Sequence, residues 1–354
     1  MKIKIQKSIY KATLLVILLA ACSLNFLGCL PKSIPSGDDP LKRTEFVLGT
    51  SVTISLYDHQ SSDLLNKAFN KLRDLEDILS INKSDTLIDT INKNAAIKSV
   101  KVDSETLFII TKSLEYSTLS DGSFDITIGP IVKLWNIGFP DARVPSPEEI
   151  DANLNLVDYR QIEIDQSNNA VFLKSKGMLI DLGGIAKGYA ADEVVKMLKQ
   201  NGTRHALVDI GGNVYALGTK PDGSLWKIGI QDPFNPRGRV IGSIALSDKS
   251  IVTSGIYERY LEEGGKKYHH ILNPDTGYPF ENELASVTVI TSNSIDGDAL
   301  STSVFSKGLE DGLEFVDTLE DVEAIFVTKD KKVYITKNLE DSFALTDDTF
   351  KLMK

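Results

Sequence analysis

An aspartate and a threonine four residues apart form a pair suited to holding a metal ion. Asp298 and Thr302 lie in residues 296–305 (DGDALSTSVF), and in a helix their side chains would point the same way, one turn apart. A carboxylate and a hydroxyl are hard oxygen ligands of the kind that magnesium prefers, and they leave positions for water and phosphate. The same pattern also suits an aspartate that stabilises the first turn of a helix beside a solvated threonine.

A glycine-rich segment, residues 181–192 (DLGGIAKGYAAD), could bind an anion. The pattern predicts a strand that ends in two glycines, followed within a few residues by a helix. Glycines let the backbone approach a ligand closely, and the start of a helix offers free amides to an anion. Lys187 adds a positive charge in the same turn. The spacing is neither that of a Walker A loop nor that of a dinucleotide fingerprint, and a tight turn with a solvated lysine has the same pattern.

Two adjacent histidines, His269 and His270, precede a Pro-Asp-Thr-Gly turn in residues 268–277 (YHHILNPDTG). Adjacent side chains on a strand face opposite ways, so only one of the two can enter a given site. A neutral imidazole there could act as a general base, although a structural histidine would look the same. In a fourth segment, residues 121–130 (DGSFDITIGP), glycines are expected to mark turns around a short strand, with an aromatic ring nearby that could cover a flat ligand.

The elements that must position these residues indicate an α+β protein with mixed or antiparallel sheets flanked by helices. Helices are predicted over residues 62–79, 103–118, 186–200 and 296–308. Strands are predicted over residues 44–56 with a break at Gly49, over 160–181 with a turn at 166–169, over much of 204–252, and over 284–291, 324–327 and 332–336. Since strands and helices do not alternate strictly, a doubly wound sheet is disfavoured.

The first 42 residues are predicted to direct export and anchoring. Four lysines precede the apolar run 12–21, as in a signal peptide, and the run is too short for a comfortable membrane span. Its end at Cys22 resembles a bacterial lipobox, with Cys29 as an alternative and an ordinary cleaved signal as another. Residues 1–21 are thus predicted to be a signal peptide, 22–42 an acylated cysteine with a flexible tether, and 43–354 the folded domain, anchored on the periplasmic or outer face of a membrane.

Composition excludes some other classes of function. The net charge of the 354-residue chain is −10, a balance that repels phosphate backbones, so no nucleic-acid partner is expected. Both cysteines lie in the first 29 residues, so the folded part can contain neither a disulfide nor a thiolate metal site.

Taken together and in order, the segments resemble the ApbE family of flavin transferases, which are extracytosolic and are usually lipoproteins. The similarity covers roughly residues 44–345. The matching segments are 46–50 (FVLGT), 123–130 (SFDITIGP), 181–192, 208–213 (VDIGGN), 253–257 (TSGIY), 270–277 (HILNPDTG), 286–290 (SVTVI) and 298–302 (DALST).

The resemblance implies a reaction and a set of site residues. FAD, bound in a cleft between subdomains, would react with a threonine or serine of an exported target protein, such as a subunit of a membrane redox complex, to give FMN-linked protein and AMP. His270 would take the proton from the attacking hydroxyl. Asp298, Thr302 and the carbonyl of Gly184 would hold Mg²⁺. The positions that match the FAD pocket are Leu48, Asn82, Ser123, Phe124, Asp125, Asp181, Lys187 and Leu272.

One position departs from the family pattern. Many members have a tyrosine where this chain has Asn82, and an aromatic ring there would stack on the flavin. Asparagine leaves more room for polar contacts or water, which favours hydrolysis of FAD to FMN and AMP. Three hypotheses therefore stand: a protein FMN transferase, a magnesium-dependent FAD pyrophosphatase (with both activities in one protein as a variant), and a flavin-binding lipoprotein without activity.

Overall fold

Nine strands form the central sheet of the protein, whose computed structural model describes residues 39–353. In spatial order they are β1 (Leu41–Val47), β2 (Thr50–Leu56), β6 (Ala206–Ile210), β7 (Asn213–Leu217), β10 (Lys249–Gly255), β13 (Leu284–Thr291), β14 (Glu323–Thr328), β15 (Lys332–Ile335) and β17 (Lys351–Leu352). All neighbours are antiparallel except β15 and β17. The sheet therefore confirms the predicted antiparallel or mixed α+β class.

Smaller sheets surround the central one. They are built from β3 (Val100–Lys101), β4 (Ile162–Asp165) and β5 (Ala170–Leu173); from β8 (Trp226–Gln231), β9 (Val240–Leu246) and β16 (Phe343–Leu345); and from the hairpin of β11 (Tyr260–Glu263) and β12 (Lys266–His269). The sheet of β8, β9 and β16 encloses a second apolar core against the central sheet, formed by residues such as Trp226, Ile251 and Phe343.

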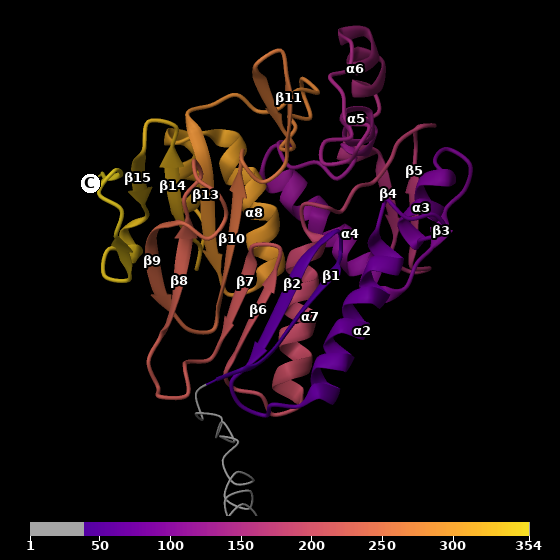
Figure 1. Ribbon diagram of the computed structural model, residues 1–354. Helices are drawn as coiled ribbons and strands as arrows, with labels where there is room; N and C mark the ends of the chain where they lie inside the picture. The colour runs from indigo at the N-terminus through magenta and orange to yellow at the C-terminus, as the bar shows by residue number, and fades with distance from the viewer. Residues whose placement is uncertain (1–38, 354) are drawn as a thin grey trace, which may run out of the picture. The chain divides into compact units, whose positions relative to one another are not determined.

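Helices cover the other face of the central sheet (Figure 1). The α-helices of the described residues are α2 (Ser62–Leu79), α3 (Leu87–Lys93), α4 (Ser104–Leu119), α5 (Gly129–Trp135), α6 (Pro147–Leu154), α7 (Ala186–Gln200), α8 (Ser294–Lys307) and α9 (Glu310–Asp317). Short 3₁₀ turns add Tyr159–Gln161 and Lys337–Leu339. Helices α2, α7 and α8 each contribute several buried apolar side chains to the main core.

The helix predicted over residues 62–79 is confirmed as α2, and local sequence signals explain its limits. Ser61 accepts a hydrogen bond from the amide of Leu64, which satisfies one of the free donors at the start of α2. Leu65, Leu72 and Leu79 are buried along one face, so the apolar stripe packs into the core. The predicted limits are the observed ones.

One predicted strand is absent, and another is shorter than predicted. The strand predicted within 121–130 is wrong, because Asp125 accepts bonds from the amide and hydroxyl of Thr127 and so closes a turn. Helix α5 then begins at Gly129, with Pro130 in its first turn. Proline is tolerated there because the amides of the first turn have no partner within the helix. The strand pair predicted over 160–181 with a turn at 166–169 is confirmed as β4 and β5, but β5 ends at Leu173, so no strand leads into the glycine-rich segment.

Predictions for the amino terminus lie outside the described residues. These are the signal peptide of residues 1–21, the acylated cysteine (Cys22 or Cys29) and most of the tether. Residues from Pro40 onward form one compact unit. Among residues 39–353 no helix is long and apolar enough to span a membrane.

Candidate functional site

The site is built where the first turns of α7 and α8 meet. Gly188 lies so close to α8 that a β-carbon there would come within 2.2 Å of the carbonyl oxygen of Ser294. Asp192 accepts hydrogen bonds from the amides of Ser294 and Ile295 at 2.7 and 2.8 Å, and so caps the start of α8 from the neighbouring helix. Burial raises the pKa of Asp192 to about 6. The glycine and the last aspartate of residues 181–192 therefore fix the two helices against each other.

This packing places Lys187 against Asp298. The Lys187 ammonium lies 3.1 Å from Oδ1 of Asp298 and donates to the carbonyl of Gly183 at 3.1 Å. Oδ2 of Asp298 accepts a hydrogen bond from the amide of Gly188 at 2.9 Å. Asp298 is only 4% exposed, so its negative charge is held in a largely dry position between a cation and an amide. Residues 111 positions apart in the chain thus form one polar centre.

The glycine-rich turn brings further predicted residues to the same place. Asp181 accepts a hydrogen bond from the amide of Gly183 at 2.8 Å. A β-carbon on Gly184 would lie 3.0 Å from the ring of Phe124, so the turn packs directly on that aromatic side chain. Ser123, next to Phe124, shares a 2.8 Å hydroxyl contact with Ser306 of α8. The segments 121–130 and 181–192, predicted separately, are therefore parts of one site.

Two positively charged residues of this site were missed by the sequence patterns. Burial raises the pKa of the Asp181 carboxyl, and the charges of Lys133, Lys187 and Arg259 act against that rise. Lys133 belongs to α5, and Arg259 directly precedes β11. Neither lies in a motif that marks a binding site, and only the tertiary fold brings them near Asp181. Such a set of cations suits a ligand with several negative charges.

The structure separates the two adjacent histidines. His269 is 8% exposed, and its Nε2 lies 2.9 Å from the carbonyl oxygen of Phe280. His270 is half-buried, and its Nδ1 lies 3.2 Å from the carbonyl oxygen of Arg259. A carbonyl can only accept, so Nδ1 of His270 carries the proton and Nε2 is left free to take one.

The positive charges around Asp181 and Asp298 also affect the pKa of His270. Burial, together with the positive charges of Arg259 and Lys187, lowers the pKa of His270 to about 3. The ring is therefore neutral at physiological pH. An anionic ligand among these cations would offset their effect and raise the pKa of His270, which would make Nε2 a better proton acceptor.

Replacing the buried His269 by glutamine should weaken the pH dependence of stability. Burial lowers the pKa of His269 to about 4, below its unfolded value near 6.5, so the unfolded chain takes up the extra proton first. The stabilising effect of the neutral ring is therefore present above about pH 6.5 and is lost as the pH falls toward 4. Urea unfolding at pH 7 and pH 5 should show His269→Gln losing about 1 to 2 kcal/mol less stability than the wild type across that interval. An equal loss in both proteins would contradict the assignment.

The donors around Asp298 fit a magnesium ion. Asp298 and Thr302 lie one turn apart on α8, as predicted. The Asp298 carboxylate shares one cation, the Lys187 ammonium, with the carbonyl of Gly183, the neighbour of the predicted ligand Gly184. No group of three or more histidine, cysteine or acidic side chains within residues 39–353 could hold a metal. A site with one carboxylate that leaves most positions to water and substrate phosphate is typical of magnesium.

Leu48 and Asn82 both lie near the carboxyl end of α2. Leu48 adopts a left-handed φ of 56° at the tip of the β1–β2 hairpin, and the next amide, that of Gly49, donates to Glu76 near the end of α2. Asn82 follows α2 and is exposed, and its Oδ1 accepts a hydrogen bond from Lys133 at 2.6 Å. The position that departs from the family pattern is therefore tied to one of the site's cations.

Two other predicted residues have clear structural roles. The Asp125 carboxylate is buried and bonded to Thr127 and to the amide of Tyr159, so it organises the loop beneath Phe124. Burial raises the pKa of Asp125. Leu272 is buried in a small apolar cluster with residues of α5, among them Trp135. Both residues shape the walls of the site.

Comparison with known proteins agrees with this arrangement. Residues 48–326 match the model of the ApbE family. The chain is 38% identical over 307 residues to the FAD:protein FMN transferase of Klebsiella pneumoniae (strain 342), with 87% of this chain and 95% of the relative covered. It is 34% identical over 327 residues to the FAD:protein FMN transferase of Treponema pallidum (strain Nichols), with 88% and 90% covered. The crystal structure of the ApbE protein of Thermotoga maritima MSB8 matches with a TM-score of 0.79 at 32% identity, covering 86% of this chain and 99% of that one. The chain belongs to the ApbE family.

Proposed function

We propose that the protein is a magnesium-dependent FAD:protein FMN transferase, which moves FMN from FAD onto a threonine or serine hydroxyl of an exported protein and releases AMP. The observation that supports this most strongly is the buried Asp298 carboxylate, which lies 3.1 Å from the Lys187 ammonium beside the carbonyl of the glycine turn. Relatives of the same family carry the name FAD:protein FMN transferase.

The residues at the start of α8 would hold the metal and the diphosphate. Asp298, Thr302 and the carbonyl of Gly184 would bind Mg²⁺, which neutralises charge on the oxygens of the phosphoanhydride when it is present. Lys187 and Arg259 would add positive charge around the same group. Asp181 and Phe124, which contact the glycine turn, would line the remainder of the FAD pocket.

His270 would prepare the nucleophile. The acceptor hydroxyl oxygen forms a bond to the phosphorus on the FMN side of the diphosphate, and the bond from that phosphorus to the bridging oxygen breaks. The bridging electron pair leaves with AMP, and the hydroxyl proton passes to Nε2 of His270. The carbonyl of Arg259, which accepts from Nδ1 at 3.2 Å, keeps the ring in the tautomer that this step needs.

One assay separates the three candidate activities. The purified protein is incubated with FAD and Mg²⁺, with and without an acceptor protein, and AMP is measured. AMP that depends on the acceptor indicates a transferase, and AMP without the acceptor indicates a pyrophosphatase. A protein that binds FAD but releases no AMP in either mixture would refute both enzymatic proposals.

A second activity, hydrolysis of FAD, is favoured by the contact between Asn82 and Lys133. The 2.6 Å hydrogen bond places an amide and an ammonium group at the position where many family members have a stacking ring. Polar groups at that edge of the pocket keep water close to the ligand. The protein would then release FMN and AMP from FAD when no acceptor is bound.

Replacing Asn82 by tyrosine should suppress hydrolysis. The ring would remove the hydrogen bond to Lys133, stack on the flavin and displace water from that edge of the pocket, so we expect about a threefold to tenfold fall in AMP release without acceptor. Asn82→Gln keeps an amide within reach of Lys133 and is the matched control, which should hydrolyse FAD as the wild type does. Equal hydrolysis by the tyrosine and glutamine variants would reject the role of this position.

We also propose that the protein is an exported lipoprotein, with Cys22 acylated and the enzyme domain tethered to a membrane. The support is the order of basic residues, apolar run and cysteine in residues 1–22. Mass analysis of the mature amino terminus distinguishes acylated Cys22 from acylated Cys29 and from an unmodified end.

A further inference from the structure

A large groove borders the candidate site. Its volume is about 1610 Å³, and its walls are the tip of the β1–β2 hairpin, the loop between β8 and β9, the β11–β12 hairpin and the segment that follows His270. The eight residues predicted to line the FAD pocket do not line this groove. It does contain Gly49, His269 and Asn273, the direct neighbours of Leu48, His270 and Leu272. The groove therefore adjoins the predicted FAD pocket, and Arg259, which lines the groove, contacts the predicted base His270 through its carbonyl at 3.2 Å.

The groove is basic although the chain is acidic. Five cationic side chains and two glutamates line it, in a protein whose net charge is −10. Each glutamate already has a partner: Glu258 accepts from Arg237 at 2.8 Å, and Glu281 accepts from Lys266 at 2.6 Å. The other three cations, Arg259, Lys267 and Lys329, form no ion pair with a carboxylate of residues 39–353. A ligand that fills the groove thus meets uncompensated positive charge.

Aromatic side chains stand exposed in the same groove. Phe46 is 79% exposed, Phe234 is 41% exposed and Tyr260 is 43% exposed, and they come from three different walls. Exposed rings together with cations are typical of surfaces that bind polypeptide.

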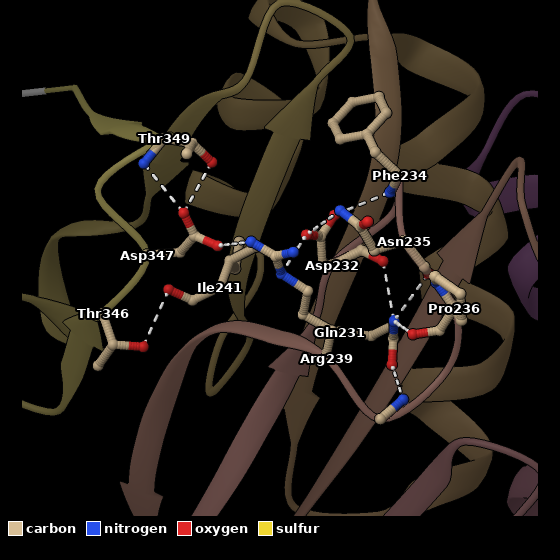
Figure 2. Close-up of polar contacts among 11 residues, drawn as sticks. Gln231, Asp232, Phe234, Asn235, Pro236, Arg239, Ile241, Thr346, Asp347 and Thr349 are labelled. Carbon is tan, nitrogen blue, oxygen red and sulfur yellow. Dashed lines mark hydrogen bonds and ion pairs between the residues drawn. The ribbon is translucent and has the colours of Figure 1, made fainter.

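One wall is held rigidly, as Figure 2 shows for the loop between β8 and β9. Asp232, buried, accepts hydrogen bonds from the amide of Phe234 and the side chain of Asn235, both at 2.8 Å. Arg239 joins Asp232 to Asp347 near the carboxyl end of the chain, at 3.5 and 3.1 Å. Hydrogen bonds from Thr349, and to a lesser extent the one from Arg239, lower the pKa of Asp347 to about 2. The loop that carries Phe234 is therefore positioned before any ligand arrives, which lowers the entropic cost of binding.

From these observations we infer that the groove binds the acceptor protein through an extended, acidic segment that carries the hydroxyl to be modified. Positive charge without a carboxylate partner selects carboxylates, and the exposed rings take apolar side chains between them. The groove is lined by Arg259, whose carbonyl lies 3.2 Å from Nδ1 of His270, the base that the threonine or serine must reach. Water, the other nucleophile, needs no such surface. The inference rests on the proposed transferase function, and it adds where the acceptor binds and which chemistry it presents.

A peptide pool tests the inference directly. Peptides of about 12 residues with one central threonine and randomised flanks are incubated with the full-length protein, FAD and Mg²⁺. Peptides that become covalently fluorescent are then sequenced, and AMP is measured in the same tube. We expect aspartate and glutamate to be enriched beside the modified threonine. The KM of an enriched peptide should rise steeply with ionic strength, because salt screens exposed charges.

A double variant and a matched control locate the effect. Lys267→Glu combined with Lys329→Glu reverses two unpaired charges in the groove, whereas Lys176→Glu combined with Lys227→Glu changes two exposed lysines outside it. The groove variant should raise the KM of the enriched peptide about tenfold and lose the acidic preference, and the control should do neither. Both should cleave FAD without peptide at the wild-type rate.

Each other outcome counts against the groove. Labelled peptides without acidic enrichment, or the same selection by the groove variant, would overturn the inference. Release of AMP with no peptide labelled would also overturn it, while leaving FAD cleavage intact. No AMP in any tube would instead refute the proposed function, on which the groove's role depends.

Discussion

Replacing Asp298 by asparagine should lower the proposed magnesium-dependent release of AMP by about a thousandfold. Among residues 39–353, Asp298 is the acidic side chain that forms an ion pair with Lys187, and the amide that replaces it cannot neutralise a cation. A metal ion or donor that stabilises charge only in the transition state contributes several kcal/mol, and each 1.36 kcal/mol is a tenfold change in rate. The test is AMP release at saturating FAD over a range of Mg²⁺ concentrations.

The choice of asparagine keeps the fold intact. Its side-chain oxygen can still accept the hydrogen bond that Gly188 donates to Asp298 at 2.9 Å, so no buried amide is left without a partner. Asp296 is a matched control, since it lies on the same helix but is bonded to Tyr116 and Lys112, away from Lys187. Asp296→Asn should retain activity. Full activity in Asp298→Asn would remove the basis for a metal site here.

Replacing His270 by alanine should lower turnover by about a hundredfold or more, with the affinity for FAD nearly unchanged. General base catalysis contributes about 10² to 10⁴ in rate, and Nε2 of His270 is the free imidazole acceptor beside Lys187 and Arg259. The constants to compare are kcat for AMP release and the dissociation constant of FAD. His59→Ala is the control. His59 is exposed, its ring contacts Asp58, and neither residue belongs to the candidate site.

The pH profile gives an independent check on His270. Its pKa in the free protein is lowered to about 3, so kcat/KM should show no acid limb near pH 6.5 that arises from this group. Bound FAD brings negative charge among the cations, so the limb of kcat should lie at higher pH than the limb of kcat/KM. A wild-type profile that is unchanged in His270→Ala would assign the proton transfer to another residue.

Local patterns predicted those elements whose signals are local. The apolar stripe and the Ser61 cap define α2, and Gly202 follows α7 as expected of a residue that ends a helix. Helix α5 was missed because its start follows Ile126 and Ile128, β-branched residues that favour a strand by propensity. The side-chain bonds of Asp125 override that propensity.

Some residues of the candidate site could likewise be predicted from local sequence, and others could not. Segments of contrasting residue type, such as the glycines around Lys187 or the pair of histidines, were visible in the sequence. The choice of His270 over His269 depends on burial, and the positions of Lys133 and Arg259 depend on contacts between distant segments, such as the bond from Lys133 to Asn82 across 51 residues. No local pattern encodes a contact of that kind, so only the fold identifies these two cations.

The most direct measurement is a crystal soaked with FAD and Mn²⁺, a magnesium substitute with an anomalous signal. Binding as proposed predicts one strong anomalous peak in contact with the side-chain oxygens of Asp298 and Thr302 and with the diphosphate of FAD, with the Lys187 ammonium moved off the carboxylate. An ordered FAD whose diphosphate lies away from α8, with no anomalous peak at Asp298, would contradict it.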